Sequence, residues 1–263
     1  NVGCCRHDGD WNWQSVRSPF ARLYYVTEGT AQVRMMSVLY TLQPHKMYFI
    51  PAYVEHDCIC TSHFVHYYIH IFEDWDSDMG LFDVYDFPVE ISAESIDLTL
   101  IKRLVSLNPL LSVPQSNPDS YDNHSSLVSN MVKQNMSPLS DRIESQGIVF
   151  ILLSRFLQKA TMKYDISDNR IKHTLVYMRR HVDDQLDIDQ LADIACMSKD
   201  HFIRVFKREV GETPYSYFVK RKQEAIERVL VTTTSSIKSV ASAMGFEDYT
   251  YFIKSFKKST GMT

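Results

Sequence analysis

Hydrophobic and polar positions alternate near the start of the chain, which is the spacing of β-strands. Between residues 20 and 72, short runs rich in Tyr, Val, Ile and Phe are separated by Glu28-Gly29, Gln43-Pro44 and Pro51. These runs are RLYYV, TAQVRM, MYFI and HFVHYYIHIF. Several short strands at close spacing predict a small β-sandwich or barrel.

Helical spacing replaces this alternation after about residue 90. Helices are expected over 92–107, 124–136 and 139–161, with a loop rich in Pro, Ser and Asn after the first of them. The helix at 139–161 is apolar over most of its circumference, so it must be buried, either in its own domain or against a partner. We interpret it as a dimer contact; packing on the β domain is the alternative.

Every segment from residue 170 onward has helical spacing. The expected helices are 170–182, 188–195, 199–209, 214–231, 237–244 and 248–259. Ser198 and Asp248 are suitable N-caps, and Pro214 suits a first helical turn. Gly211 and Gly261 suit the left-handed position after a helix. This part of the chain is therefore predicted to be all-α.

Within the helical part, one stretch occurs twice. FIRVFKREVGETP at 202–214 and FIKSFKKSTGMT at 252–263 share Phe, Ile, Phe, Lys, Gly and Thr at matching places, 50 positions apart. Two copies are too few for a solenoid, which needs at least three. A duplicated binding element is the better interpretation.

Each copy follows a short amphipathic helix and a tight turn. Ala192 and Ala241 occupy matching places in these first helices, and Cys196 and Gly245 follow four residues later. A small residue, a tight turn and a capped second helix are typical of helix-turn-helix units. Cys196 departs from the Gly that such a turn favours.

A helix-turn-helix unit places its second helix in the major groove of DNA, with its N-terminal residues toward base edges. Arg204 can donate two hydrogen bonds to guanine and Lys254 can act as a point charge, while Ile203 and Ile253 suit thymine methyl groups. The predicted base contacts are Lys199, Asp200, Ile203, Arg204, Tyr249, Thr250, Ile253 and Lys254. The predicted phosphate contacts are Lys207, Arg208, Lys257 and Lys258. The alternative is that these are ordinary solvated faces.

Charge divides the chain in the same way. The whole sequence of 263 residues has a net charge of −4, but residues 170–263 carry 16 Lys and Arg against 12 Asp and Glu. This asymmetry suggests that the basic part meets a polyanion. Five irregularly spaced cysteines predict no disulfide framework and favour a reducing cytoplasm. No apolar run reaches the length of a membrane span.

The residues from about 169 onward resemble the DNA-binding domain of AraC-type transcriptional regulators. The matching stretches are LADIACMSKDHFIRVFKREVGETPYSYF and SIKSVASAMGFEDYTYFIKSFKKSTG. The resemblance implies two recognition helices on one shared helix, here about 214–231, that enter successive major grooves of double-stranded DNA. Members of the family continue past the final Gly-x-Thr with a Pro and an aromatic-Arg pair, so the last turns of the domain are expected to lie beyond Thr263.

PHKMYFIPAYVEH at 44–56 resembles the second motif of cupin barrels, as found in AraC-type sensory domains. Cupin enzymes bind metal through an earlier His-x-His, which this sequence lacks, so neither a metal nor another cofactor is expected. His56, Cys58 and Cys60 have no zinc-finger spacing. We predict a small-molecule pocket lined by Arg22, Tyr24, His56, Tyr68 and His70, with ordinary core positions as the alternative. Trp11 and Trp13 would cover one barrel end or form a sugar-stacking platform.

These observations predict an α+β multidomain protein: a cupin-like sensor at 1–90, a helical dimerisation linker at 91–168 and a double helix-turn-helix domain at 169–263. The predicted function is a cytoplasmic, homodimeric transcriptional regulator, an activator or a repressor, that binds DNA under control of an effector such as a sugar or metabolite. RNA polymerase is a further candidate partner, and no enzymatic activity is expected. The alternatives are a cupin-type metalloenzyme or a methyl-acceptor DNA-repair protein fused to a DNA-binding domain.

Overall fold

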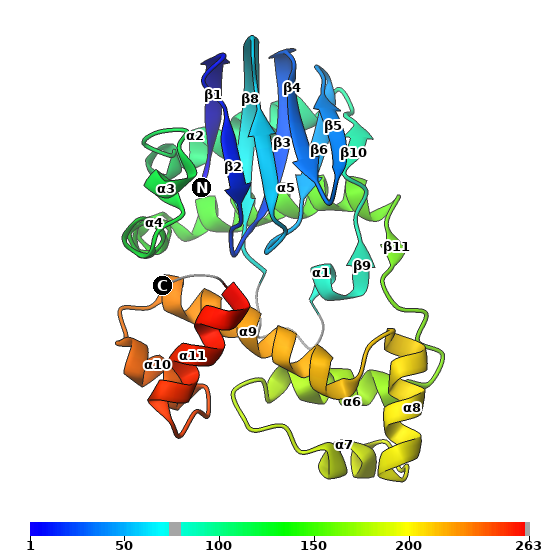
Figure 1. Cartoon of the computed structure of the whole chain (residues 1–263). Coiled ribbons are helices and arrows are strands. Elements are labelled where there is room, and N and C mark those ends of the chain that lie inside the picture. Colours follow the sequence, from blue (N-terminus) through cyan, green and yellow to red (C-terminus); the bar gives the residue numbers. More distant parts are fainter. Residues whose placement is uncertain (74–79, 261–263) are drawn as a thin grey trace. The chain divides into compact units, whose positions relative to one another are not determined.

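The chain forms two compact units, which we describe separately. The structure, a computed structural model, describes residues 1–73 and 80–260 (Figure 1). The first unit comprises residues 1–73 and 85–161, and the second comprises residues 74–84 and 162–263. The chain therefore enters the second unit briefly before it returns to complete the first.

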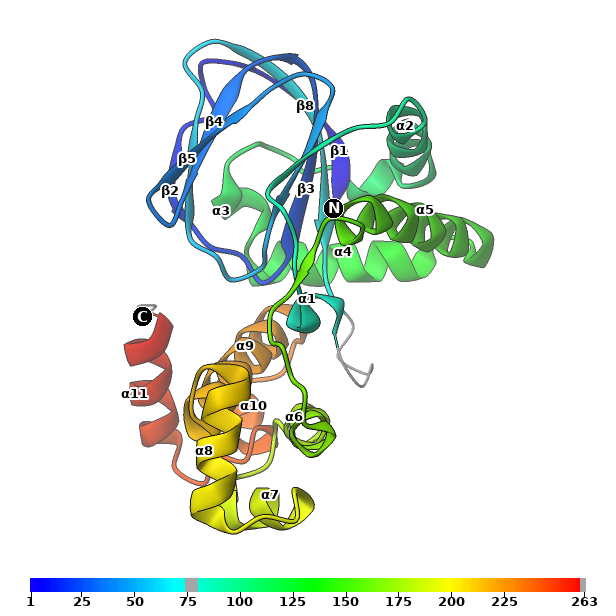
Figure 2. The same cartoon turned by 90° about the vertical axis from the view of Figure 1, so that its right-hand side faces the viewer.

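The first unit is built around two antiparallel β-sheets that face each other (Figure 2). One sheet has the strand order β1-β8-β3-β6-β10 and the other β2-β7-β4-β5. The strands are β1 (Val2–Asp8), β2 (Trp13–Val16), β3 (Ala21–Gly29), β4 (Ala31–Met35), β5 (Val38–Leu42), β6 (Lys46–Ile50), β7 (His56–Ile59), β8 (His63–Ile71) and β10 (Glu90–Ser92). Two-residue strands β9 (Tyr85–Asp86) and β11 (Thr161–Met162) complete the set of described strands.

Alternation along these strands decides which side chains enter the space between the sheets. In β3, Tyr24 and Val26 belong to the core between the sheets, whereas Leu23 and Tyr25 have the opposite parity. Tyr24 pairs with Tyr68 of β8 in register, so the inner face of the sheet continues from one strand to the next. The inner face of β8 carries Phe64 and Tyr68, which join the same core.

Helices cover the outer face of the five-stranded sheet (Figure 2). They are α2 (Asp97–Leu107) and α5 (Leu139–Leu157). Between these two helices, the chain forms a 3₁₀ turn at Pro109–Leu111, helix α3 (Pro118–Tyr121), which lies on the inner side of the sheet, and helix α4 (His124–Met136). The Phe156 ring of α5 lies 5.7 Å from that of Phe49 in β6, between centroids. Helix α5 thus packs on the β domain with one face, while Ile143 and Phe150 on another face stay exposed.

The second unit is all-α. Its helices are α1 (Leu81–Val84), α6 (Asn169–Arg180), α7 (Ile188–Ile194), α8 (Lys199–Val210), α9 (Pro214–Thr232), α10 (Ile237–Ala243) and α11 (Tyr249–Thr260). One hydrophobic core joins α6, α7 and α8 to the start of α9 through Tyr217 and Phe218. A second core joins α10 and α11 to the end of α9 through Ile226. The long helix α9 therefore supports both halves of the unit.

The structure confirms the predicted fold class, and it confirms the predicted helix-boundary roles of Gly211, Pro214 and Asp248. Gly211 has the expected left-handed φ of 86°, and α9 begins at Pro214. Asp248 accepts from the backbone N–H groups of Thr250 and Tyr251, whereas Ser198 makes no capping hydrogen bond through its side chain. Gly261 lies outside the described residues. No described helix combines the length and the hydrophobicity that crossing a bilayer would take.

Candidate nucleic-acid interface

The two copies of the repeated stretch are the second helices of two matching helix-turn-helix units. In the first unit α7 and α8 pack through Ala192, Phe202 and Phe206, all of which are buried. In the second unit α10 and α11 pack through Ala241 and Phe252. The small alanines let the second helix pass close to the first, as their place in the sequence predicts.

The turn between the helices has the same backbone structure in both units. In the first, the N–H of Cys196 donates to Asp193 O and that of Met197 to Ala192 O, and Cys196 has φ 52°. In the second, Gly245 donates to Ser242 O, Phe246 donates to Ala241 O, and Gly245 has φ 72°. This pair of hydrogen bonds is the Schellman motif, which needs a left-handed residue. Cys196 therefore adopts the backbone conformation of the glycine that it replaces, at a cost in strain.

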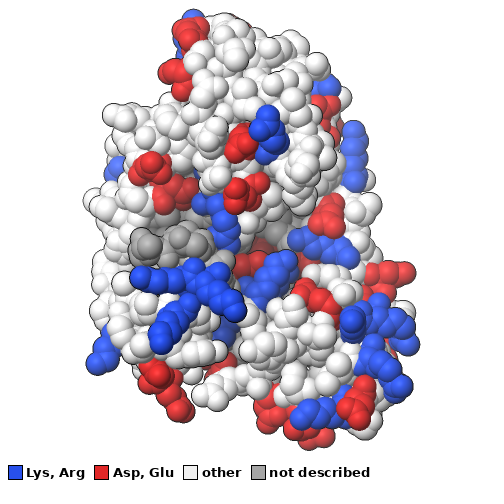
Figure 3. Space-filling model, in the orientation of Figure 1, with Lys and Arg blue, Asp and Glu red and all other residues white. Residues whose placement is uncertain are grey.

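The outer faces of α8 and α11 present the residues predicted to touch DNA. Lys199, Asp200, Arg204, Lys207 and Arg208 are exposed on α8, and Tyr249, Thr250, Lys254, Lys257 and Lys258 are exposed on α11. Ile203 and Ile253 are half-buried because each packs against the core of its unit. Lys and Arg side chains gather over the regions of α8 and α11 in Figure 3. Their role as DNA contacts stays a prediction.

The cations of the two helices differ in their local partners. On α8, Lys199 pairs with Asp189 at 2.9 Å and Arg208 with Glu209 at 2.8 Å. Arg204 Nη2 donates to His201 Nδ1 at 3.3 Å. Among the described residues, no ion pair is recorded for Lys254, Lys257 or Lys258 of α11. Local pairs on α8 would have to open or be shared before these cations met phosphate.

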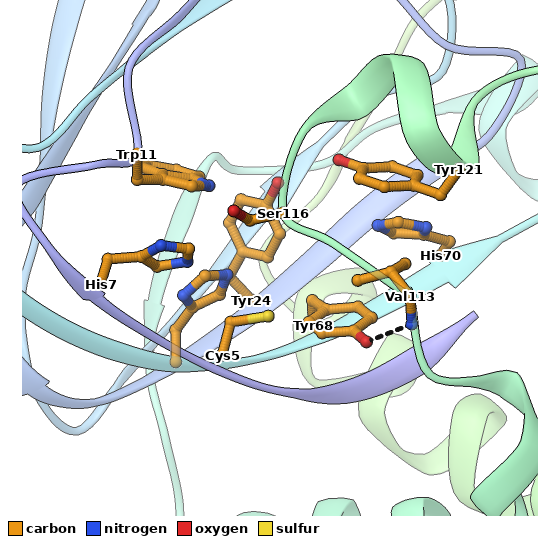
Figure 4. Close-up of a pocket in the computed structure, with 10 residues that line it drawn as sticks. Cys5, His7, Trp11, Tyr24, Tyr68, His70, Val113, Ser116 and Tyr121 are labelled. Atoms are coloured by element: carbon orange, nitrogen blue, oxygen red, sulfur yellow. Dashed lines mark hydrogen bonds between the residues drawn. The ribbon is translucent and has the colours of Figure 1, made fainter.

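A cavity lies between the sheets of the first unit (Figure 4). Its volume is about 20 Å³, which is room for about one water molecule. Strand β1 contributes Cys5 and His7, and β8 contributes His66 and His70. The remaining lining residues are Trp11, Tyr24, Tyr68, Val113, Ser116 and Tyr121. The Tyr68 hydroxyl accepts from the N–H of Val113 at 2.8 Å, which ties the loop before α3 to the barrel.

Of the five predicted pocket residues, three line this cavity: Tyr24, Tyr68 and His70. Arg22 and His56 do not, although both are buried. Arg22 donates to Ser18 Oγ at 2.6 Å and pairs with Asp122 at 3.4 Å. His56 Nδ1 donates to Val54 O at 3.1 Å. Trp11 lies against the cavity as a wall, while Trp13 packs on the core.

Sequence reasoning missed the lining contributed by β1 and by residues 113–121. Cys5 and His7 share the inward parity of β1, because they pair in register with His66 and Phe64 of β8. The alternation of side chains between residues 2 and 8 is the signal that could have indicated this strand, although the polar residues in the stretch conceal it. In the described part of the chain, no three His, Cys, Asp or Glu side chains are arranged to hold a metal ion. Cys58 and Cys60 instead lie in the hydrophobic core.

The cavity holds its histidines in the neutral form. Burial lowers the pKa of His66 to about 3, with a further lowering from His7. Burial also lowers the pKa of His7, and it lowers that of His70 well below its ordinary value. Outside the lining, burial and the nearby Arg22 lower the pKa of His56 to about 4. A neutral imidazole has one donor and one acceptor. His7 Nδ1 donates to Asp10 Oδ1 at 3.1 Å and His70 Nδ1 accepts from Asn1 Nδ2 at 3.3 Å, so each of these rings has its Nε2 left for a ligand. The cavity therefore suits an uncharged ligand with hydrogen-bonding groups.

Lowering the pH from 7 to 5 is expected to destabilise the first unit. Below about pH 6.5 the unfolded chain protonates its histidines, whereas folded His66 stays neutral down to about pH 3. Unfolding therefore takes up protons, and each such histidine lowers the free energy of unfolding by up to about 1.4 kcal/mol per pH unit. Thermal unfolding at pH 7, 6 and 5 measures this slope. His66→Phe should flatten it, while exposed His173→Gln should leave it unchanged; an equal slope in His66→Phe would contradict the expectation.

The second unit thus has the architecture of a double helix-turn-helix DNA-binding domain. Residues 191–263 match a family model described as a helix-turn-helix domain. The chain is 33% identical over 87 residues to the MmsAB operon regulatory protein of Pseudomonas aeruginosa, and 28% identical over 110 residues to the xylose operon regulatory protein of Escherichia coli. These alignments cover 33% and 41% of this chain but only 28% of each relative. The C-terminal region is therefore a helix-turn-helix domain, as its motifs predict, and it is similar to parts of these operon regulatory proteins.

The similarity to one of the solved structures extends over the whole length of the chain. ToxT from Vibrio cholerae, solved with a bound unsaturated fatty acid, matches with a TM-score of 0.52 and 11% identity, covering 100% of this chain and 92% of that chain. This similarity confirms the order of a β-rich N-terminal unit followed by a helical one. At this level of identity it concerns the fold alone.

Proposed function

We propose that the protein regulates transcription by binding double-stranded DNA through α8 and α11. The carrying observation is the repeat of one helix-turn-helix unit, with the same Schellman turn, at both ends of α9. A single basic helix is an ordinary solvated face. Two such helices held by one shared helix form a surface that can enter two grooves of the same duplex. The relatives that carry this type of domain are operon regulatory proteins.

The two recognition helices should read different base sequences. Asp200-His201 on α8 stands where Thr250-Tyr251 stands on α11, and all four residues are exposed. Arg204 can make a bidentate contact with guanine, which the matching Lys254 cannot. The site read by one subunit is therefore expected to be asymmetric.

Arg204→Ala is expected to weaken DNA binding by about 1–3 kcal/mol at one base pair of the site. The reason is that a bidentate guanine contact is lost while the phosphate contacts remain. Affinity for a selected site and for variants substituted at single base pairs gives the measurement. Lys220→Ala, which removes an exposed cation of α9 outside the recognition helices, is the control. A uniform loss across all variants would make Arg204 a phosphate contact.

We further propose that a small, uncharged effector binds in the cavity between the sheets. The lining is aromatic, with three imidazoles held neutral and hydroxyl groups from Tyr24, Ser116 and Tyr121. Such a lining can stack on a ring and exchange hydrogen bonds with hydroxyl groups. A sugar or another small metabolite fits this chemistry, and the cavity would have to widen to admit it. The structure of ToxT with a bound unsaturated fatty acid supports a ligand for a protein of this fold, although that ligand ends in a carboxylate.

The exposed face of α5 supports a homodimer. Leu139, Ile143 and Phe150 lie on one side of this helix and are 67%, 60% and 66% exposed. Gly147 lies on the same side with open space around it, so another helix can approach closely there. The opposite side of α5 carries the buried Leu152 and Phe156. An apolar face of this kind on a helix that is already packed suits a second copy of the same helix.

Ile143→Glu combined with Phe150→Glu is expected to give monomers. In a twofold-symmetric dimer, the two new carboxylates of one subunit would be buried opposite the same two carboxylates of the other subunit. Sedimentation equilibrium measures the mass, and circular dichroism confirms that the fold is intact. Val38→Glu, at an exposed apolar residue of β5, should leave the mass unchanged. A dimeric mass in the folded double variant would remove α5 from the interface.

The proposal contains no catalytic step. It places the protein in the cytoplasm, with DNA and, at a promoter, RNA polymerase as macromolecular partners. Binding of the effector would change how the two DNA-binding units of a dimer are arranged. This change requires that the effector bind one arrangement with higher affinity than the other.

A further inference from the structure

A short segment of the N-terminal half of the sequence belongs to the DNA-binding unit. Strand β8 ends at Ile71 and β10 begins at Glu90, so the intervening chain connects two strands of the five-stranded sheet. Within this connection, helix α1 (Leu81–Val84) is part of the helical unit. The chain therefore passes between the two units at three places, after residues 73, 84 and 161.

Four polar contacts hold this segment. One carboxylate oxygen of Asp83 lies 2.6 Å from Arg221 Nη1 of α9, and the other pairs with Arg179 of α6. Lys163 Nζ donates to Phe82 O at 2.7 Å, and the N–H of Lys163 donates to Val84 O at 2.8 Å. The segment is thus bound through both its backbone and its one acidic side chain.

The ionic contacts are shielded from water. The side chains of Asp83, Arg179 and Arg221 are 12%, 6% and 11% exposed. Arg221 also pairs with Glu224 at 2.8 Å and lies over the ring of Tyr217, with 5.2 Å from Cζ to the centroid. Breaking a buried ion pair by removing one partner is strongly destabilising, because the other charge stays desolvated. Without Asp83, two buried guanidinium groups would lose a shared carboxylate.

The position of the two arginines connects this cluster to DNA binding. Arg221 lies near the middle of α9, between the residues that join the first core, Tyr217 and Phe218, and the residue that joins the second, Ile226. Arg179 lies in the last turn of α6, which packs in the first core. A change at this cluster therefore acts on the helix that positions both recognition helices.

We propose that Arg179 and Arg221 form a carboxylate-binding site in the DNA-binding unit, occupied within the same chain by Asp83, and that this contact couples the effector unit to DNA binding. Effector-dependent movement of β9, which directly follows the segment in the chain, would pull on the segment and so on α9. The coupling rests on the proposed function; the anchoring of the segment does not. The partner of the site is residues 80–84 of this chain.

Hydrogen exchange of the full chain, followed by mass spectrometry, tests the anchoring without DNA or effector. Asp83→Asn keeps the size of the side chain and removes its charge. Amides of residues 81–84 and of the middle of α9 are expected to exchange at least tenfold faster, with β1–β8 unchanged. Asp165→Asn, which removes an exposed carboxylate of the same unit, is the matched control. Exchange within twofold of the unchanged protein, or an equal acceleration in the control, would overturn the anchoring.

A second variant guards against simple loss of folding. Arg179→Met should also accelerate the exchange of residues 81–84, and the double variant with Asp83→Asn should exchange no faster than Asp83→Asn alone, since that variant already removes the contact with Arg179. Multiplicative acceleration would mean that the two residues act independently and would refute the site.

The coupling is tested by DNA affinity in the same variants. Asp83→Asn is expected to change affinity for a selected site at least threefold, while Asp165→Asn does not. Faster exchange with unchanged affinity would refute the coupling and leave the anchored segment. A chain that binds no DNA in any form would refute the proposed function, while the exchange data would still decide the anchoring.

Discussion

Phe206→Ala is expected to cost about 3–5 kcal/mol of stability and to unfold much of the first helix-turn-helix unit. Phe206 is fully buried, and its ring centroid lies 5.7 Å from that of Phe202 and 5.9 Å from that of Tyr217. It therefore joins α8 to α9. Since domains of this size are stable by only about 5–15 kcal/mol, such a loss is a large part of the total. Denaturant unfolding followed by circular dichroism gives the measurement.

Phe256→Ala is the matched variant, because Phe256 occupies the same place in the second copy. Phe256 is half-buried and stacks on Phe252 at 5.9 Å between centroids. Its loss should therefore cost less than that of Phe206, by roughly the difference in buried apolar area. An equal loss of unfolding free energy in the two variants would show that Phe256 is as well shielded from solvent as Phe206. DNA affinity should follow stability in each case, since recognition helices need their cores.

Gly245→Ala is expected to disrupt the second turn. A Cβ built on Gly245 would lie 2.4 Å from Asp183 O, and φ is 72°. The backbone conformation alone costs about 1–3 kcal/mol for a residue with a side chain. In addition, Asp183 O would have to move away from the new Cβ. Two hydrogen bonds oppose this movement, because Lys222 Nζ donates to Asp183 O at 3.2 Å and to Asp184 O at 2.5 Å. Thermal unfolding and DNA affinity should both be lowered.

Cys196→Gly at the matching turn should have the opposite sign. Cys196 is exposed and has φ 52°, so glycine would relieve about 1–2 kcal/mol of left-handed strain, less the entropy that glycine adds to the unfolded chain. A modest stabilisation, with DNA binding retained, is expected. If both substitutions destabilised equally, the two turns would not share the geometry described above.

The cause of this difference between the turns is tertiary. Both turns have the same local hydrogen bonds, and both need a left-handed residue. At Gly245 the loop that carries Asp183 and Asp184 lies directly against the Cα, whereas Cys196 is exposed to solvent. A side chain is therefore tolerated at the first turn and excluded from the second, which explains why only one copy keeps glycine.

The sequence by itself determined the helical part of the protein. The helices expected at 199–209, 214–231 and 237–244 are observed at Lys199–Val210, Pro214–Thr232 and Ile237–Ala243. Capping residues, apolar spacing and the left-handed position are set by neighbours within a few residues along the chain, so a repeat of these signals specifies a repeat of the structure. The type of DNA-binding domain follows from the same local signals.

Only the tertiary structure decided what lies inside the β-rich unit and what holds residues 80–84. Cys5 and His7 of β1 enter the cavity through pairing with β8, some sixty residues away, and Arg22 turns instead to Ser18 and Asp122. Asp83 meets Arg179 and Arg221 across about a hundred residues or more. Strand register and buried ion pairs depend on partners that are distant in sequence. Alternation shows which side chains of a strand share a face, but it does not show which strand pairs beside it. Local pattern therefore defined the helices of the helix-turn-helix units, whereas long-range pairing defined the cavity and the contacts that hold residues 80–84.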